Sequence, residues 1–161
     1  MATEAQRKHL KALMKWLVSK ESLVHYRQAR PMATIHWIEQ PLADHFEKGL
    51  TISSDCSEMV TLLCKLSGLQ DPNGRGYDGY GNTDSILSHL PHYSDPSAAQ
   101  VGALCVYGPQ GRSHHVVMVY EPGKDPLCFS HGTESDPRFV RWSVEKAYQP
   151  APATFCSIRH L

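Results

Sequence analysis

Apolar residues near the start of the chain recur with the period of a helix. A capping-box pair, Thr3 and Gln6, precedes them. The pattern predicts an amphipathic helix over residues 4–25. The apolar stripe of this helix consists of Leu10, Leu13, Met14 and Leu17. The remaining positions carry five Lys and Arg residues, which we interpret as a solvated face rather than a membrane-binding one.

The middle of the chain is predicted to hold a second helix. Pro31 ends any helix before it, and the segment that follows is expected to be irregular apart from a short strand at 34–38. The second helix starts near Ser54 or Asp55, since either residue can act as its N-cap, and Gly68 is its stop signal.

The last third of the chain has the pattern of a strand meander. Residues 70–82 are dense in turn formers and predict a loop, after which Thr83 caps a short helix that Pro91 ends. The strands expected beyond residue 101 are Leu104–Tyr107, His115–Glu121, Leu127–Ser130, Phe139–Trp142 and 154–158. Helices followed by antiparallel strands predict an α+β fold, and we expect one domain over residues 1–161.

Composition narrows the classes of function. The chain has 161 residues, of which 41% are hydrophobic and 20% charged, as in an ordinary globular domain. Sixteen basic and sixteen acidic residues cancel, so neither nucleic acid nor a membrane surface is an expected partner. The N-terminus lacks the apolar core of a signal peptide, and we expect the protein to be made in the cytoplasm.

One of the five cysteines differs from the others. Four lie among apolar residues and are expected to be buried, reduced and inert. Cys56 lies between Asp55 and Ser57, in the first turn of the second predicted helix. Unpaired amides there favour a thiolate and can also donate to an oxyanion, so Cys56 is a candidate nucleophile. The alternative is a cysteine that merely tolerates a helix start.

A thiol nucleophile requires a base, and histidines stand at the ends of two predicted strands. His114 and His115 open one strand on opposite faces, and alternation alone does not choose between them because both faces are apolar. His131 ends the next strand. A hairpin would bring it beside the base, where it could fix the tautomer through the second ring nitrogen. Otherwise His131 is a turn residue next to Gly132.

These motifs, in this order, resemble the NlpC-type branch of the papain-like cysteine peptidases. The resemblance covers about residues 50–135 and rests on Asp55-Cys56-Ser57, Val101-Gly102-Ala103-Leu104, His115-Val116-Val117-Met118-Val119-Tyr120 and Ser130-His131-Gly132. It implies a papain-like fold with Cys56 as nucleophile, His115 as base and His131 as the orienting residue. The chain departs from the family in having Glu58 where glycine is usual, and Ala103 where aspartate is usual.

The resemblance also supplies candidates for substrate contacts. Tyr26 is the candidate for an aromatic hydroxyl that assists the oxyanion, and Ser57 of the cysteine motif is a further candidate. Tyr77 and Tyr80 are expected on a loop at the substrate rim. Two runs, residues 26–32 and 71–81, are similar to peptidase modules of bacteriophages that infect actinobacteria. This implies peptidoglycan stem peptides as substrate, with further lysin or virion modules as partners and action on the wall after release or within a virion.

Other classes stay open from the sequence. The same fold could serve as a non-catalytic wall-binding or tail-assembly module, or act as an N-acetylmuramoyl-alanine amidase or a host-protein deamidase. The loop that begins at Asp71 partly matches a calcium loop, but Arg75 and Asn82 occupy ligand positions. Zinc chemistry is not expected because the HExxH and CxxC patterns are missing, and we expect neither a metal nor a cofactor.

Overall fold

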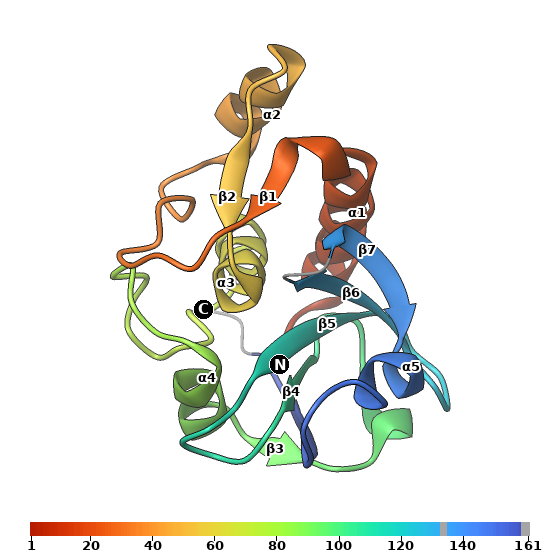
Figure 1. The fold of residues 1–161 in the computed structure, drawn as a ribbon. Coiled ribbons are helices and arrows are strands. Elements are labelled where there is room, and N and C mark those ends of the chain that lie inside the picture. The colour runs from red at the N-terminus through yellow and green to blue at the C-terminus, as the bar shows by residue number, and fades with distance from the viewer. Residues whose placement is uncertain (133–134, 159–161) are drawn as a thin grey trace.

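The fold is α+β and is built on one antiparallel sheet (Figure 1). A computed structural model describes residues 1–132 and 135–158, without the side chains of 135 and 136. The sheet has the strand order β3-β8-β4-β5-β6-β7. In that order its strands are His92–Tyr93, Ala153–Cys156, Leu104–Tyr107, His115–Glu121, Leu127–Gly132 and Ser135–Arg141. The predicted meander is therefore confirmed for β4, β5 and β6, while β8 folds back to pair with β4.

The first helix is shorter than its sequence pattern predicted. α1 spans Glu4–Ser19, and the expected capping box between Thr3 and Gln6 is present. The chain then forms a short 3-10 turn, η1 (Glu21–Leu23), and the strand β1 (Val24–Tyr26). β1 pairs in parallel with β2 (Ile52–Ser54). The prediction of a helix over 4–25 was wrong at its end, because β1 has a partner far along the sequence that helical periodicity cannot reveal.

The segment expected to be irregular contains another helix. α2 covers Glu39–Glu47, and its Pro41 lies in the first turn, where its missing N–H costs no intrahelical bond. The strand expected at 34–38 does not form. Instead, the backbone N–H and hydroxyl of Thr34 donate to the carboxylate of Glu58, at 3.0 and 2.6 Å. In Figure 1, α2 stands at the top of the molecule, away from the large sheet.

The central helix α3 runs from Cys56 to Leu66 and begins where the sequence placed it. Asp55 is the N-cap, and Gly68 follows the helix with a positive φ of 71°. α1 and α3 pack against one face of the sheet, where Val116 and Met118 of β5 belong to the larger core. The loop after α3 leads to α4 (Thr83–His89), which is capped by Asn82 rather than by Thr83.

The opposite face of the sheet carries a smaller core that is central to the site. Val117 and Val119 of β5 point to this side, together with Cys128 of β6. The short helix α5 (Trp142–Lys146) follows β7 and covers this face, and Trp142 donates its indole N–H to the Cys105 sulfur at 3.3 Å. A 3-10 turn, η2 (Pro96–Ala98), precedes β4.

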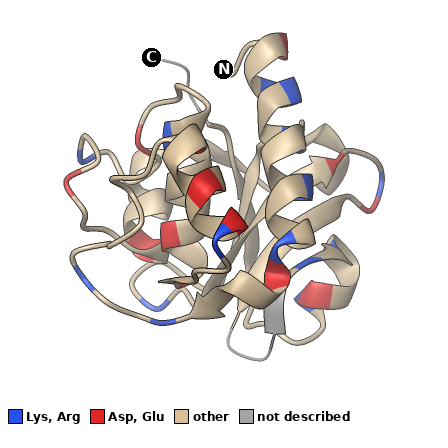
Figure 2. Cartoon of the chain, turned by 90° about the horizontal axis from the view of Figure 1, so that it is seen from above, with Lys and Arg blue, Asp and Glu red and all other residues tan. Residues whose placement is uncertain are grey.

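Basic and acidic residues both occur in the view of Figure 2. Figure 2 shows basic residues following one another along α1, with acidic residues on neighbouring elements. Lys11 of α1 lies over the ring of Tyr120, 4.9 Å from its centroid, so the stem of this lysine packs on the protein. Within the described ranges, no helix is long and apolar enough to cross a membrane.

Candidate active site

The candidate nucleophile, Cys56, lies at the N-terminus of α3, where hydrogen bonds fix the first turn. Cys56 is the first residue of the helix and is 7% exposed. The Asp55 carboxylate accepts the backbone N–H of Glu58 at 2.8 Å, which fixes the first turn. Amides at this end of a helix, together with the macrodipole, favour a negative charge on the sulfur.

Arg30 holds the residues on either side of Cys56. Its guanidinium donates to Asp55 Oδ2 and Ser57 Oγ, both at 2.9 Å, and to the Gly81 carbonyl at 2.8 Å. The Arg30 charge thus neutralises Asp55 beside the thiol. Ser57 is 2% exposed and also donates to Asp55 at 3.1 Å. The Ser57 hydroxyl therefore helps to hold the helix start, and its expected contact with a substrate stays a prediction.

His115 is the histidine of the adjacent pair that faces the site. It opens β5 and is 5% exposed, whereas His114 is exposed at the surface. Its Nε2 lies 2.9 Å from Ser130 Oγ and 3.2 Å from Glu145 Oε1. The ring also stacks beside Tyr107, with centroids 6.2 Å apart.

The pKa of His115 is raised by the groups that surround it. Burial lowers the pKa, but hydrogen bonds with the Cys56 thiol and the Glu145 carboxylate, and the negative charges of these two groups, raise it to about 9. Because Glu145 and Ser130 contact Nε2, the nitrogen left for Cys56 is Nδ1. The arrangement is a thiol, an imidazole and a carboxylate in sequence, which suits acyl transfer through a thioester.

Glu145 is a candidate site residue that sequence reasoning missed. It lies on α5 and is 2% exposed. The hydrogen bond from His115 lowers the pKa of its carboxyl group, against the effect of burial. Gln149 donates to Oε1 at 3.1 Å, and Arg138 lies 3.5 Å from Oε2. No local motif marks it, and the family resemblance ends before it. A search for carboxylates downstream of His115 would have included it.

His131 does not take the orienting position that was expected for it. The hairpin of β5 and β6 is present, with Met118 opposite Phe129. This register places Ser130 on the same face as His115 and turns His131 to the other face. There, Nε2 of His131 lies 2.9 Å from the Ser54 carbonyl and 3.2 Å from the His25 carbonyl. His131 thus ties β6 to β1 and β2, and Glu145 with Ser130 occupies the position beside the base.

Strand pairing brings Tyr26 to the segment that leads into the candidate nucleophile Cys56. Tyr26 is opposite Ser54 in the β1–β2 pair, and Ser54 precedes the N-cap Asp55. The Tyr26 hydroxyl accepts a hydrogen bond from Gln28 at 3.0 Å, and its ring centroid is 5.7 Å from that of His131. Tyr26 therefore remains a candidate for the hydroxyl that assists the oxyanion. It lies on β1 rather than at the end of a helix.

The two tyrosines of the 70–82 loop differ in role. The Tyr77 hydroxyl donates to the Leu69 carbonyl at 2.7 Å, and this residue has a positive φ of 59°. Tyr77 is thus part of the loop framework, and its expected place at the substrate rim stays a prediction. Tyr80 is 47% exposed and is free to meet a partner.

Asp71 organises this loop through its carboxylate. It accepts the backbone N–H groups of Asn73, Arg75 and Tyr77 at 2.9, 3.1 and 2.9 Å. These bonds use the oxygens that a calcium ion would need. In the described part of the chain, no group of three or more His, Cys, Asp or Glu side chains could hold a metal ion.

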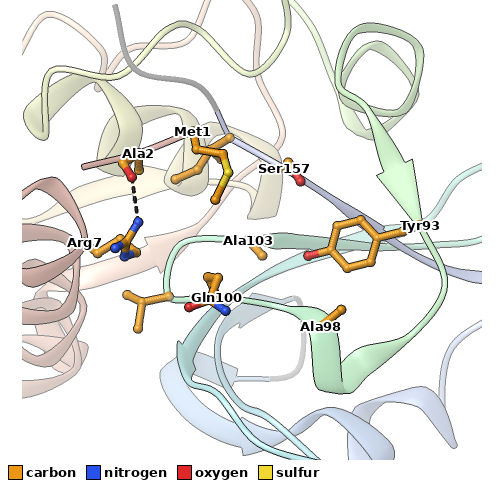
Figure 3. A pocket seen from close by; sticks show the side chains of 10 residues that line it. Met1, Ala2, Arg7, Tyr93, Ala98, Gln100, Ala103 and Ser157 are labelled. Atoms are coloured by element: carbon orange, nitrogen blue, oxygen red, sulfur yellow. Dashed lines mark hydrogen bonds between the residues drawn. The ribbon is translucent and has the colours of Figure 1, made fainter. Parts of the chain in front are cut away.

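A cavity of about 170 Å³ lies apart from these residues (Figure 3). Met1, Ala2 and Arg7 line one side, and Tyr93 and Ser157 line the other. Arg7 donates to the Ala2 carbonyl at 2.6 Å, as the dashed line in Figure 3 marks. None of the candidate site residues borders this cavity.

Comparison with known proteins found no matching family, no similar curated protein and no similar solved structure. The chemistry of the buried Cys56, His115 and Glu145 therefore carries the functional argument.

Proposed function

We propose that this protein is a cysteine hydrolase of the papain-like, NlpC-type class, with Cys56 as nucleophile, His115 as base and Glu145 as orienting carboxylate. The observation that carries the proposal is the buried contact of His115 with Glu145 on one side and the Cys56 thiol on the other. A structural ion pair needs no thiol at a helix N-terminus, whereas a hydrolase needs all three groups in this order.

The reaction is acyl transfer. The Cys56 thiolate attacks an amide carbon, and helix amides at the start of α3 stabilise the oxyanion, with Tyr26 as a further donor. His115 then protonates the leaving amine from Nδ1, which yields a thioester. His115 next takes a proton from water, and the hydroxide releases the acid and restores the thiol. Glu145 stabilises the imidazolium throughout.

We propose peptidoglycan stem peptides as the substrate. This rests on the resemblance of residues 26–32 and 71–81 to phage peptidase modules, and on the exposed Tyr80 beside a rigid loop. The enzyme would act on the cell wall after release from the host cytoplasm or as part of a virion, and further lysin or virion modules are its expected partners. It needs no cofactor for this reaction.

The test is digestion of purified diaminopimelate-type peptidoglycan with wild-type protein, Cys56→Ala and His115→Ala, followed by mass spectrometry of soluble products. We expect new peptide termini with the wild type alone, and the masses identify the bond. Cleavage between sugar and peptide would instead identify an amidase. Absence of products from a wild-type protein that is folded by circular dichroism would leave the non-catalytic wall-binding or assembly module as the better explanation.

A further inference from the structure

Every nitrogen of the Arg30 guanidinium donates a hydrogen bond. Nη1 donates to Asp55 Oδ2 at 2.9 Å and to the Ala29 carbonyl at 2.7 Å. Nη2 donates to Ser57 Oγ at 2.9 Å, and Nε donates to the Gly81 carbonyl at 2.8 Å. These bonds reach both the start of α3 and the loop that follows this helix. One side chain thus joins two segments on which the candidate site depends.

The segment next to Arg30 also holds this loop through its backbone. The N–H of Met32 donates to the Gly79 carbonyl at 2.7 Å. A Cβ on Gly79 would lie 3.0 Å from the Cβ of Pro31, so the two segments are in close contact at this point. Tyr80 stands between the two anchored glycines, and it is 47% exposed. This segment therefore fixes the backbone on both sides of a tyrosine that is expected to meet the substrate.

Two buried carboxylates lie at the start of α3, near Arg30. The side chain of Asp55 is 8% exposed and that of Arg30 is 23% exposed. Burial raises the pKa of Glu58, the charge of Asp55 raises it further, and the charge of Arg30 lowers it. His115 is a further charged group that acts on Cys56. Water screens a partly buried pair less than a surface pair, so without Arg30 the Asp55 charge would oppose a thiolate at the next residue.

We propose that Arg30 is a positioning residue for the nucleophile. Its charge allows Asp55 to cap α3 without opposing the Cys56 thiolate. Its Nε holds the loop that carries Tyr80 against the same helix start. This inference rests on the proposed function, in which Cys56 attacks as a thiolate. A lysine would keep the charge but lacks the planar fork, so it could not make all of these bonds at once.

The first test measures how the rate of Cys56 alkylation by iodoacetamide depends on pH, with the modified residue located by tandem mass spectrometry. In Arg30→Met, the pH at the half-maximal rate should rise by about one unit. Arg27→Met is the matched control, since it removes the same charge from an exposed position on the same segment, and its profile should equal that of the wild type. When Asp55→Asn is added to Arg30→Met, the wild-type profile should return, because asparagine still caps the helix and no charge is left uncompensated.

The second test measures the link to the loop by hydrogen exchange. Amides of residues 30–32 and 77–82 should exchange faster in Arg30→Lys than in the wild type, because the lysine cannot hold the loop and the helix start together. The alkylation profile of this variant should stay close to that of the wild type, because the charge is kept. Arg27→Lys is the control and should leave exchange unchanged.

The outcomes are read without any peptide substrate. An unmoved profile in Arg30→Met, an equal shift in Arg27→Met, or a shift that Asp55→Asn does not reverse would overturn the proposal. If Arg30→Met is unfolded by circular dichroism, Arg30→Lys decides, and unchanged exchange or a shifted profile in this variant would overturn it.

These assays also separate the role of Arg30 from the proposed cleavage. An Arg30-dependent profile in a protein that does not digest peptidoglycan would support the positioning role and reject the peptidase activity. Digestion by a protein whose alkylation profile is independent of Arg30 would support the peptidase and reject the positioning role.

Discussion

Oε1 of Glu145 lies 3.2 Å from Nε2 of His115, and the two residues are only 2% and 5% exposed. A carboxylate at this distance in a buried position fixes the ring tautomer and stabilises the imidazolium. The contact joins α5 to the first residue of β5. It explains why burial, which lowers a histidine pKa, is outweighed here.

Replacement of Glu145 by glutamine should therefore change both rate and pH dependence. We expect kcat/KM to fall about 10- to 100-fold, since the amide keeps a contact but not the charge. The pKa of His115 is about 9 in the wild type. In Glu145→Gln the imidazolium should lose its proton at a lower pH than this, so the alkaline limb of the pH–rate profile should shift to lower pH. Glu121→Gln, at an exposed site on the same strand as His115, is the control. An unmoved alkaline limb in Glu145→Gln would reject this role.

Replacement of His131 by alanine should have a different effect. His131 is 1% exposed, and its ring contacts the carbonyls of Ser54 and His25. Loss of these contacts should lower the free energy of unfolding by about 2 kcal/mol, measured by urea denaturation. The alkaline limb of the folded variant should stay at its wild-type pH. A shift like that of Glu145→Gln would restore His131 as the orienting residue.

Iodoacetamide should distinguish Cys56 from the other thiols. Burial raises the pKa of Cys105 and Cys156 to about 12, and it raises the pKa of Cys64 and Cys128 still further. These four thiols are thus protonated near neutral pH and unreactive. We expect carboxymethylation of the Cys56 peptide at pH 7 at least tenfold faster than of the others, measured by peptide mass spectrometry. Equal rates at all five cysteines would argue against a catalytic thiol.

Stability should fall as the pH rises above neutrality. The pKa of His115 is raised from 6.5 to about 9, so the folded protein binds the proton more tightly than the unfolded chain. This contribution, about 3 kcal/mol at most, is fully present below pH 6.5 and is lost as the pH rises through about 9. Urea denaturation between pH 6 and 9.5 measures it. The slope should be shallower in Cys56→Ala, because the thiolate is one of the groups that raise the pKa, and an identical slope would contradict the pairing.

Local signals in the sequence located several elements correctly. The capping box at Thr3, the N-cap at Asp55 and the strands β4 and β5 lie where they were expected. These features depend on side chains within a few residues of each other, or on long alternating runs between turns. The α+β class followed from their order. Cys56 and His115 were chosen as candidates because of where they stand, and each does open the element expected for it.

Features that depend on distant contacts were not predictable in the same way. β1 and β2 have three residues each, too few for alternation to be visible, and they are strands only because they pair. Thr34 looked like a strand residue but bonds to Glu58. The position of His131 depended on the register of a hairpin, which fixes the face of every side chain. Glu145 reaches His115 only because β7 returns along the sheet and α5 folds over its face.

The order of Cys56, His115 and Glu145 along the chain also sets when the proposed site can form during synthesis. The ribosome delivers Cys56 early, His115 later and Glu145 last, and domains fold as their segments emerge. A nascent chain that already displays the nucleophile has no carboxylate to hold its base in place. Products truncated before α5 would therefore keep the Cys56 thiol but lack the carboxylate that contacts His115. Under the proposed mechanism, the set of Cys56, His115 and Glu145 is complete only once translation has passed residue 145.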